Sequence, residues 1–328
     1  MKTEILKLLR ESEGYVSGQK LCGKLGVSRT AVWKIINQLK EEGSHVEAVQ
    51  NRGYRIVDIP DVLSEEELKS LLFGKTRWAG QEIHYFPETD STNIRAKELG
   101  EKGASHGALA VADRQSAGRG RRGRGWESPP GCSIYMSILL RPSFLPSSAP
   151  MLTLVMAYST AEALQECTGQ EIRIKWPNDI VLNKKKLVGI LTEMSSEIDY
   201  INHVVIGVGI NVNMDSFSEE IAKTATSLRI ETGKVMKRST LIAEIMKHFE
   251  RNYDTFLQSG DLSGIREDYN RLLVNCGKEV RILGAKEPYQ ALALGINDSG
   301  ELLVRKQDGS EEAVYAGEVS VRGIYGYV

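Results

Sequence analysis

The hydrophobic pattern changes character twice along the chain, and this change limits the fold more than any single motif. Residues 1–60 show short amphipathic helices and a β-hairpin pattern, residues 64–273 alternate strands with helices, and residues 274–328 show short strands between turn signals. A chain of 328 residues can give each of three such segments a core of its own. We therefore predict a multidomain α+β protein with three domains at these boundaries.

The first segment carries a helix-turn-helix pattern. Ser17 and Ser28 are suited to cap a second and a third helix, and Gly26 ends the second. The third helix runs to about Glu41, with one apolar face and one face of polar side chains large enough to reach into a DNA groove. A β pattern follows that is broken by Asn51-Arg52-Gly53, a hairpin turn signal. The segment therefore predicts a winged helix-turn-helix.

This segment also holds positive charge that the whole chain lacks. Residues 1–57 contain ten Lys and Arg against six Asp and Glu, which is a net charge of +4, whereas the whole chain has −1. Such an excess suits a small DNA-binding module. A three-helix module for protein interaction is the alternative. The residues that we expect to contact DNA lie on the third helix and the wing: Ser28, Arg29, Thr30, Trp33, Lys34, Asn37, Arg52 and Arg55.

The second and third segments give a coarse order of elements. After a linker at residues 58–61, the chain predicts a mixed α/β domain, and the Asn-Asp-Ser-Gly and Asp-Gly hairpin signals after residue 296 predict a small SH3-like β-barrel. We expect strands at residues 83–86, 108–112, 133–140, 172–176, 187–194, 203–211, 278–283, 289–296, 302–306 and 313–315, and helices at 93–101, 152–167, 240–257 and 262–273.

Composition narrows the class of protein without naming it. The four cysteines lie far apart and show no metal-ligand spacing, which favours free thiols in a reducing compartment. No apolar run approaches the roughly 20 residues of a membrane span, and residues 1–4 lack a signal-peptide pattern. We therefore expect a cytoplasmic protein with no membrane partner.

The arginine-glycine loop, residues 118–126, reads Gly-Arg-Gly-Arg-Arg-Gly-Arg-Gly-Trp. Apart from the tryptophan, its side chains do not form a core. Arginine keeps its charge and its donors match phosphate or carboxylate oxygens, while glycine lets the backbone approach a ligand. The loop therefore predicts an anion site, with an unstructured segment of loose RNA affinity as the alternative.

Three further clusters look chemical. Ser91, Thr92 and Asn93 follow a strand at the start of a helix, and these three polar groups exceed what a helix cap needs. Lys175-Trp176-Pro177-Asn178-Asp179 ends another strand, although it could be a plain Asn-Asp turn, and Lys186 adjoins an apolar strand at the end of a lysine run that is otherwise typical of a solvated hairpin tip. No phosphate-loop motif and no nucleophile beside a base occurs, so covalent catalysis has no support.

Taken in order, these motifs resemble those of one enzyme family. The polar triplet, Gln115, the arginine-glycine loop, the Lys-Trp-Pro-Asn-Asp block and Lys186-Leu187-Val188-Gly189-Ile190-Leu191 together resemble biotin–protein ligases. The N-terminal winged helix makes the chain similar to the bifunctional type, which also represses biotin biosynthesis genes. The resemblance covers all three segments. Gly125 stands where some relatives have lysine, and the arginine pattern is intact.

The resemblance implies a reaction and its ligands. Such enzymes join biotin to ATP, with Mg²⁺ bridging the phosphates, and then transfer biotin from biotinyl-5′-adenylate to a lysine of the biotin carboxyl carrier protein of acetyl-CoA carboxylase. By analogy, the biotin site consists of Ser91, Thr92, Asn93, Gln115, Gly118, Arg119, Gly120, Arg121 and Lys186. The ATP site consists of Arg119, Arg121, Trp126, Asn178, Asp179, Lys186 and Asn211.

The same resemblance assigns roles. Arg119, Arg121 and Lys186 are implied to be catalytic, because they can neutralise the biotin carboxylate and the α-phosphate. Trp126 is implied to stack on adenine, and Asp179 is a candidate ligand of Mg²⁺. Adenylate is implied to promote a homodimer that binds a two-fold symmetric operator of biotin genes. A lipoate ligase-like enzyme and a catalytically inactive ligand-sensing transcription factor are the alternatives.

Overall fold

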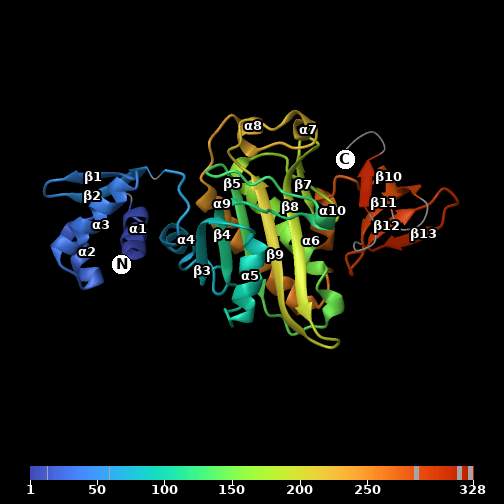
Figure 1. The fold of residues 1–328 in the computed structure, drawn as a ribbon, viewed down its shortest axis with the longest axis horizontal. Helices are drawn as coiled ribbons and strands as arrows, with labels where there is room; N and C mark the ends of the chain where they lie inside the picture. The colour runs from blue at the N-terminus through green and yellow to red at the C-terminus, as the bar shows by residue number, and fades with distance from the viewer. Residues whose placement is uncertain (13, 59, 284–287, 316–319, 324–327) are drawn as a thin grey trace.

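A computed structural model of the chain describes residues 1–12, 14–58, 60–283, 288–315, 320–323 and 328. Three units follow one another along its long axis, with the N-terminal unit at one end and the C-terminal β unit at the other (Figure 1). The predicted fold class is confirmed: a helix-turn-helix with a wing, a mixed sheet covered by helices, and a small antiparallel β domain. Within the described residues, none of the helices is both long and apolar enough to span a bilayer.

The N-terminal unit has the winged helix-turn-helix arrangement that its sequence predicts. Ser17 Oγ accepts from the backbone N–H of Lys20 and Ser28 Oγ accepts from that of Ala31, so both predicted caps are present. Gly26 ends the second helix in the left-handed conformation. The elements are α1 (Lys2–Arg10), α2 (Gly18–Leu25), α3 (Arg29–Glu41) and the antiparallel strands β1 (His45–Val49) and β2 (Gly53–Asp58).

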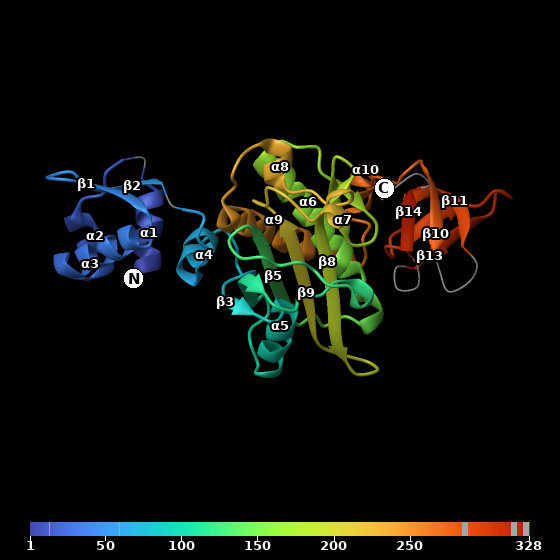
Figure 2. The same cartoon turned by 45° about the horizontal axis from the view of Figure 1, so that its top comes forward.

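The central unit is built on a seven-stranded sheet in the order β3-β4-β5-β9-β8-β7-β6. β3 and β4 are parallel, and every other neighbouring pair in this sheet is antiparallel. The long strands β8 and β9 cross the middle of the unit (Figure 2). The strands are β3 (Ile83–Thr89), β4 (Leu109–Gln115), β5 (Ser133–Leu140), β6 (Arg173–Lys175), β7 (Asp179–Leu182), β8 (Lys185–Ser196) and β9 (Ile201–Asn211).

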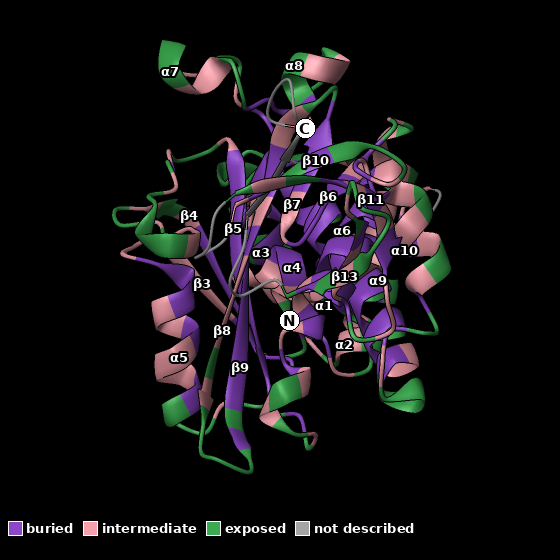
Figure 3. Ribbon diagram, turned by 90° about the vertical axis from the view of Figure 1, so that its right-hand side faces the viewer, coloured by how far each residue is buried: buried purple, intermediate pink, exposed green. Residues whose placement is uncertain are grey.

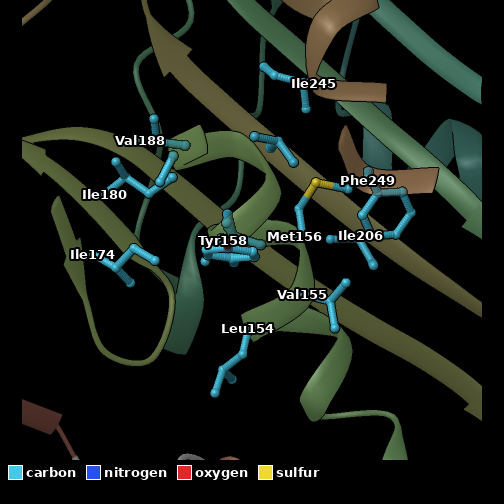
Figure 4. Close-up of a cluster of buried hydrophobic side chains, with 14 of the residues drawn as sticks. Leu154, Val155, Met156, Tyr158, Ile174, Ile180, Val188, Ile206, Ile245 and Phe249 are labelled. Carbon is cyan, nitrogen blue, oxygen red and sulfur yellow. The ribbon is translucent and has the colours of Figure 1, made fainter. Parts of the chain in front are cut away.

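Helices cover both faces of this sheet. α5 (Thr92–Glu101) lies on one face, while α6 (Met151–Thr168) and α9 (Arg238–Ser259) pack on the other (Figure 3). The larger core lies under α6 and α9, where side chains such as Met156, Ile206 and Phe249 are fully buried (Figure 4). The remaining helices are α4 (Glu65–Leu72), α7 (Glu219–Ala222), α8 (Leu228–Thr232) and α10 (Arg266–Leu272).

The C-terminal unit is a five-stranded antiparallel sheet in the order β13-β12-β11-β10-β14. Its core is continuous with that of the central unit. Trp176 is fully buried and donates from Nε1 to the backbone oxygen of Gly300, which joins the two units. The strands are β10 (Glu279–Leu283), β11 (Tyr289–Ile296), β12 (Leu302–Arg305), β13 (Glu311–Val314) and β14 (Ser320–Gly323).

The structure differs from the predicted elements in its short pieces. The predicted helix at 262–273 is α10, which begins only at Arg266. β7, β14 and the short helices α7 and α8 were not predicted, because segments of four or five residues carry too little periodicity to stand out. The predicted strand at 172–176 is confirmed as β6, and the Pro177 turn connects it to β7 in a hairpin.

Candidate functional site

A small cavity lies where the start of α5, the end of β4 and the strands β8 and β9 meet the arginine-glycine loop. Its volume is about 50 Å³. Ser91, Thr92 and Asn93 reach it from the start of α5, and Gln115 reaches it from the last position of β4. The other lining residues are Arg119, Gly120, Arg121, Trp126, Tyr135, Asn178, Lys186, Gly189, Ile190, Leu191, Gly207, Val208 and Gly209.

A larger cleft of about 870 Å³ adjoins this cavity. Trp126, Lys186 and Gln115 line both spaces, so the two spaces share a wall. Gly118, Asp179 and Asn211 line the larger cleft. Every residue that the sequence assigned to biotin or ATP therefore lines one of the two adjoining spaces, although these residues come from six separate segments of the chain.

The arginine-glycine loop folds back on itself as a small hairpin. The backbone N–H of Gly120 donates to the oxygen of Arg124 at 2.7 Å, and the N–H of Trp126 donates to the oxygen of Gly118 at 2.9 Å. A short 3₁₀ turn, Arg121–Gly123, forms its tip. The loop therefore closes over the cavity with a defined backbone, which disfavours the interpretation as an unstructured RNA-binding segment.

Positive charge gathers at the smaller cavity. Arg119, Arg121 and Lys186 line it, and none of its described lining residues is a carboxylate. Arg121 Nη1 donates to Asn178 Oδ1 at 2.7 Å, and Lys186 Nζ lies 2.7 Å from Asp179 Oδ1, which faces the larger cleft. Burial lowers the pKa of Arg121 from its ordinary value, and a bound anion would offset that cost. The cavity is therefore suited to a carboxylate or a phosphate.

Glycines on the sheet make room for the side chains above them. A Cβ at Gly189 or Gly209 would lie 2.7 Å from the Trp126 ring, and a Cβ at Gly207 would lie 2.0 Å from Asn93 Oδ1. The Trp126 ring therefore packs against strand positions where no residue larger than glycine fits. Its Nε1 is buried and has no hydrogen-bond partner among the described residues.

Four residues at or around the site were not predicted from the sequence. Tyr135 lines the cavity from β5, and Ser128 accepts from Gln115 Nε2 at 3.0 Å. Ser137 and Glu193 bind Asn93 from two strands far apart in sequence. No local motif marks these four residues, because each belongs to a strand or a loop whose own pattern reads as ordinary structure.

The predicted DNA-contact residues lie on two elements of the winged unit. Arg29, Thr30, Lys34 and Trp33 are exposed on α3, and Trp33 keeps 55% of its surface in contact with solvent. Asn37 is partly buried, and the Ser28 hydroxyl caps the helix. On the wing, Arg52 is exposed, whereas Arg55 pairs with Glu47 at 3.1 Å and lies over the Tyr15 ring.

Comparison with known families defines the class of protein that this fold and site represent. A helix-turn-helix domain matches residues 2–55, the biotin/lipoate A/B protein ligase family matches residues 85–211, and the biotin protein ligase C-terminal domain matches residues 276–322. These domains occur in the order of the three structural units. The chain is thus a biotin–protein ligase that carries a DNA-binding domain.

Individual relatives refine this class. The bifunctional ligase/repressor BirA of Bacillus subtilis is 38% identical over 325 residues, which is 98% of each chain, and that of Escherichia coli is 32% identical over 97% of this chain and 96% of its own. The biotin protein ligase of Aquifex aeolicus, solved with biotin and ATP, is 32% identical with a TM-score of 0.66 and covers 74% of this chain and 99% of its own. The chain belongs to the family of bifunctional biotin ligase/repressors.

The predicted function is thereby confirmed at the level of the family. The protein is a biotin–protein ligase and a repressor, as these relatives are, and biotin and ATP are bound in the Aquifex structure.

Proposed function

We propose that biotin binds at the smaller cavity, which at about 50 Å³ has to open to admit it, and that ATP binds in the larger cleft, so that the biotin carboxylate and the α-phosphate meet at the wall formed by Trp126 and Lys186. The single observation that carries this proposal is the shared wall: Lys186 lines both spaces, and Arg119 and Arg121 line the smaller cavity beside it. Attack of a carboxylate oxygen on the α-phosphate releases pyrophosphate, and two anions approach only if cations neutralise them. Arg119, Arg121 and Lys186 provide that neutralisation.

The residues divide by position. Ser91, Thr92, Asn93 and Gln115 hold the ring end of biotin, since they line the smaller cavity and offer hydrogen bonds. The arginine-glycine loop covers the acyl phosphate and excludes water, because Gly118, Gly120 and Arg121 line these spaces. Trp126 stacks on adenine, and Asn211, which donates from Nδ2 to the Thr226 oxygen at 3.0 Å, borders the nucleotide.

The second step needs a lysine amine beside the acyl carbon. That amine attacks the carbonyl carbon of biotinyl-adenylate and AMP leaves, so charge builds on the leaving phosphate. Lys186 stabilises that charge while Asp179 holds its ammonium group in place. We propose that the acceptor is one lysine of the biotin carboxyl carrier protein of acetyl-CoA carboxylase.

Asp179 is also suited to assist Mg²⁺. Its carboxylate lines the larger cleft beside the junction of the two spaces, and Mg²⁺ prefers such oxygen ligands. Bound with ATP, Mg²⁺ neutralises phosphate charge. Lys186, 2.7 Å from Asp179, keeps this carboxylate oriented toward the cleft.

The repressor function couples this site to the winged unit. We propose that biotinyl-adenylate promotes a homodimer of central domains that presents two copies of α3 and of the wing to a two-fold symmetric operator of biotin genes. Residues 191–196 of β8 pair with β9 on one side only, within the described sheet, and such an edge can pair with the same edge of a second copy. The DNA contacts would come from Arg29, Trp33 and their predicted neighbours.

The unit boundaries and location are proposed on the same grounds. Domains at residues 1–60, 64–273 and 274–328 are supported by the separate hydrophobic core of the winged unit and by the change from helices to an antiparallel sheet after α10. All four cysteines are free, which supports a reducing compartment such as the cytoplasm.

Biotin-dependent exchange of pyrophosphate into ATP tests the ligase assignment. We expect exchange with the full chain only when biotin is present, followed by labelling of a carrier-protein domain. Absence of biotin-dependent exchange would contradict the proposed site. Sedimentation of the full chain with and without biotin and ATP tests the dimer: we expect a mass increase with both ligands, and an unchanged monomer would contradict the coupling.

A further inference from the structure

A chain of hydrogen bonds lies beneath Thr92 at the edge of the smaller cavity. Ser137 Oγ lies 2.7 Å from Asn93 Oδ1 and 2.8 Å from Thr92 Oγ1. Asn93 Nδ2 lies 2.8 Å from Glu193 Oε2 and 3.3 Å from the backbone oxygen of Leu191. These hydrogen bonds therefore link the carboxylate of Glu193, on β8, through Asn93 and Ser137 to the hydroxyl of Thr92.

The partners of Asn93 determine which way its amide points. A carboxylate and a backbone carbonyl accept hydrogen bonds and cannot donate, so the NH₂ group must face Glu193 and Leu191. The amide oxygen then faces Ser137 and lies directly over Gly207, where a Cβ would be only 2.0 Å away. Asn93 is 4% exposed, and this amide has one orientation.

The orientation of Asn93 determines where the hydroxyl hydrogens lie. The Asn93 oxygen is an acceptor, so the hydrogen of Ser137 points to it. Ser137 then has only lone pairs for Thr92, so the hydrogen of Thr92 points to Ser137. Gln115 Oε1 accepts from the Thr92 backbone N–H at 2.8 Å and, 3.2 Å from Thr92 Oγ1, is a second and more distant acceptor for the same hydroxyl hydrogen, which in either case points away from the cavity. Toward the cavity, Thr92 Oγ1 thus presents lone pairs.

Glu193 can hold this role because it remains ionised. Burial opposes ionisation, but hydrogen bonds from Lys97 and Asn93 outweigh it and hold the pKa of Glu193 below its ordinary value. The Lys97 ammonium binds the second carboxylate oxygen, Oε1, and leaves Oε2 for Asn93. The Glu193 carboxylate, where this series of hydrogen bonds begins, therefore carries no proton and only accepts hydrogen bonds.

We propose that Glu193 and Ser137 are positioning residues that set the hydrogen-bond polarity of the cavity, so that Thr92 selects a ligand ring that carries an N–H donor over one that lacks it. The cyclic urea of biotin carries such donors, and a dithiolane ring carries none. This inference rests on the proposed placement of the biotin ring beside Thr92. It separates recognition of the ring from the chemistry at Lys186.

The test compares biotin with two analogues, each of which differs from it at one ring atom. Biotin and its two cyclic carbamate analogues, in which a ring oxygen replaces one ureido N–H, are titrated by calorimetry into the full chain. The readout is the ratio of the dissociation constant of the carbamate to that of biotin. We expect one isomer to bind the parent protein at least about tenfold more weakly, because its oxygen faces the Thr92 lone pair. The ratio matters because a general loss of structure weakens both ligands alike.

Glu193→Ala and Ser137→Ala are each expected to reduce this ratio at least about threefold, mainly through weaker biotin binding. Glu193→Gln keeps an acceptor for Asn93, so its ratio should stay near that of the parent. Glu98→Gln, which removes a partly exposed ion pair with Arg95 on α5, is the matched control and should leave the ratio unchanged. Unchanged ratios in both alanine variants, or loss of the ratio in Glu193→Gln, would overturn the inference.

Thr92→Val separates this inference from the proposed ligand placement. If biotin does not lie beside Thr92, this variant leaves biotin affinity unchanged, and the placement itself fails. If Thr92→Val weakens biotin binding while the Glu193→Ala and Ser137→Ala ratios equal that of the parent, the placement holds and the polarity chain is wrong.

Discussion

Arg238 and the cations around Lys186 show two opposite uses of positive charge in one domain. Arg238 is 1% exposed, and its guanidinium binds Asp61 at 2.7 Å and Asp113 at 2.8 Å. Arg121 binds the neutral amide of Asn178, and Lys186 binds Asp179 while also lining a cavity with no described carboxylate.

The difference separates structure from function. A buried arginine whose donors meet two carboxylates stabilises the fold, here by fixing the linker residue Asp61 to strand β4. Cations that face a cavity bring positive charge that a bound anionic ligand can neutralise. Sequence types alone do not make this distinction, since all of these are arginines and lysines beside polar residues.

The largest effect is expected on stability, when the buried structural arginine Arg238 is replaced. Arg238→Met leaves the partly buried Asp61 and Asp113 without their buried cation, and we expect the free energy of unfolding to fall by about 3–5 kcal/mol. Urea denaturation measures it. Arg271→Met, which removes an exposed pair with Asp268, should change stability by no more than about 0.5 kcal/mol. Equal losses in both variants would show that Arg238 is not special.

Lys186→Met tests the other half of this comparison, because it removes a cation that faces the cavity. This change removes a charge where negative charge builds in the reaction, so we expect the rate of adenylate formation to fall by about 10²–10³ with little loss of stability. Rapid-quench measurement of adenylate gives the rate. Lys184→Met, at the exposed turn two residues earlier, is the matched control. A rate within twofold of the parent in Lys186→Met would contradict the assigned role.

How far the sequence predicts the molecule depends on the range of the contacts. The winged unit was predicted closely, because Ser17, Gly26 and Ser28 act on residues only a few positions away. The cations of the site were predicted from a dense local motif. Ser137 and Glu193 were not, because their contacts with Asn93 depend on strand register across the sheet, which no local pattern encodes.

The glycines that lie against the Trp126 ring allow a further test of how the cavity binds its ligand. Gly209→Ala places a Cβ 2.7 Å from the indole, so the ring must shift, at a cost of about 1–3 kcal/mol, and we expect binding of biotinyl-adenylate to weaken about tenfold. Calorimetry or competition measures the affinity. Gly23→Ala, on α2 with no atom within 4 Å of the added Cβ, should leave it unchanged. Unaltered affinity in Gly209→Ala would mean that Trp126 does not contact the ligand.

The smallest effect concerns the wing, where the same contrast recurs. Both arginines lie over the Tyr15 ring, but Arg52 is exposed, whereas Arg55 is also paired with Glu47. We expect Arg52→Ala to weaken operator binding and to reduce the slope of log affinity against log salt by about 1, as loss of one phosphate contact does. Arg55→Ala should change the slope less. A larger change in Arg55→Ala would reverse the comparison at this surface.

The release of biotinyl-adenylate tests most directly the claim that the arginine-glycine loop covers the junction of the two ligands. The dissociation rate of biotinyl-adenylate is measured by stopped flow for the parent chain and for Arg121→Gly, which removes the bond from the loop to Asn178. We predict release at least about tenfold faster in the variant. Equal release rates would contradict the account.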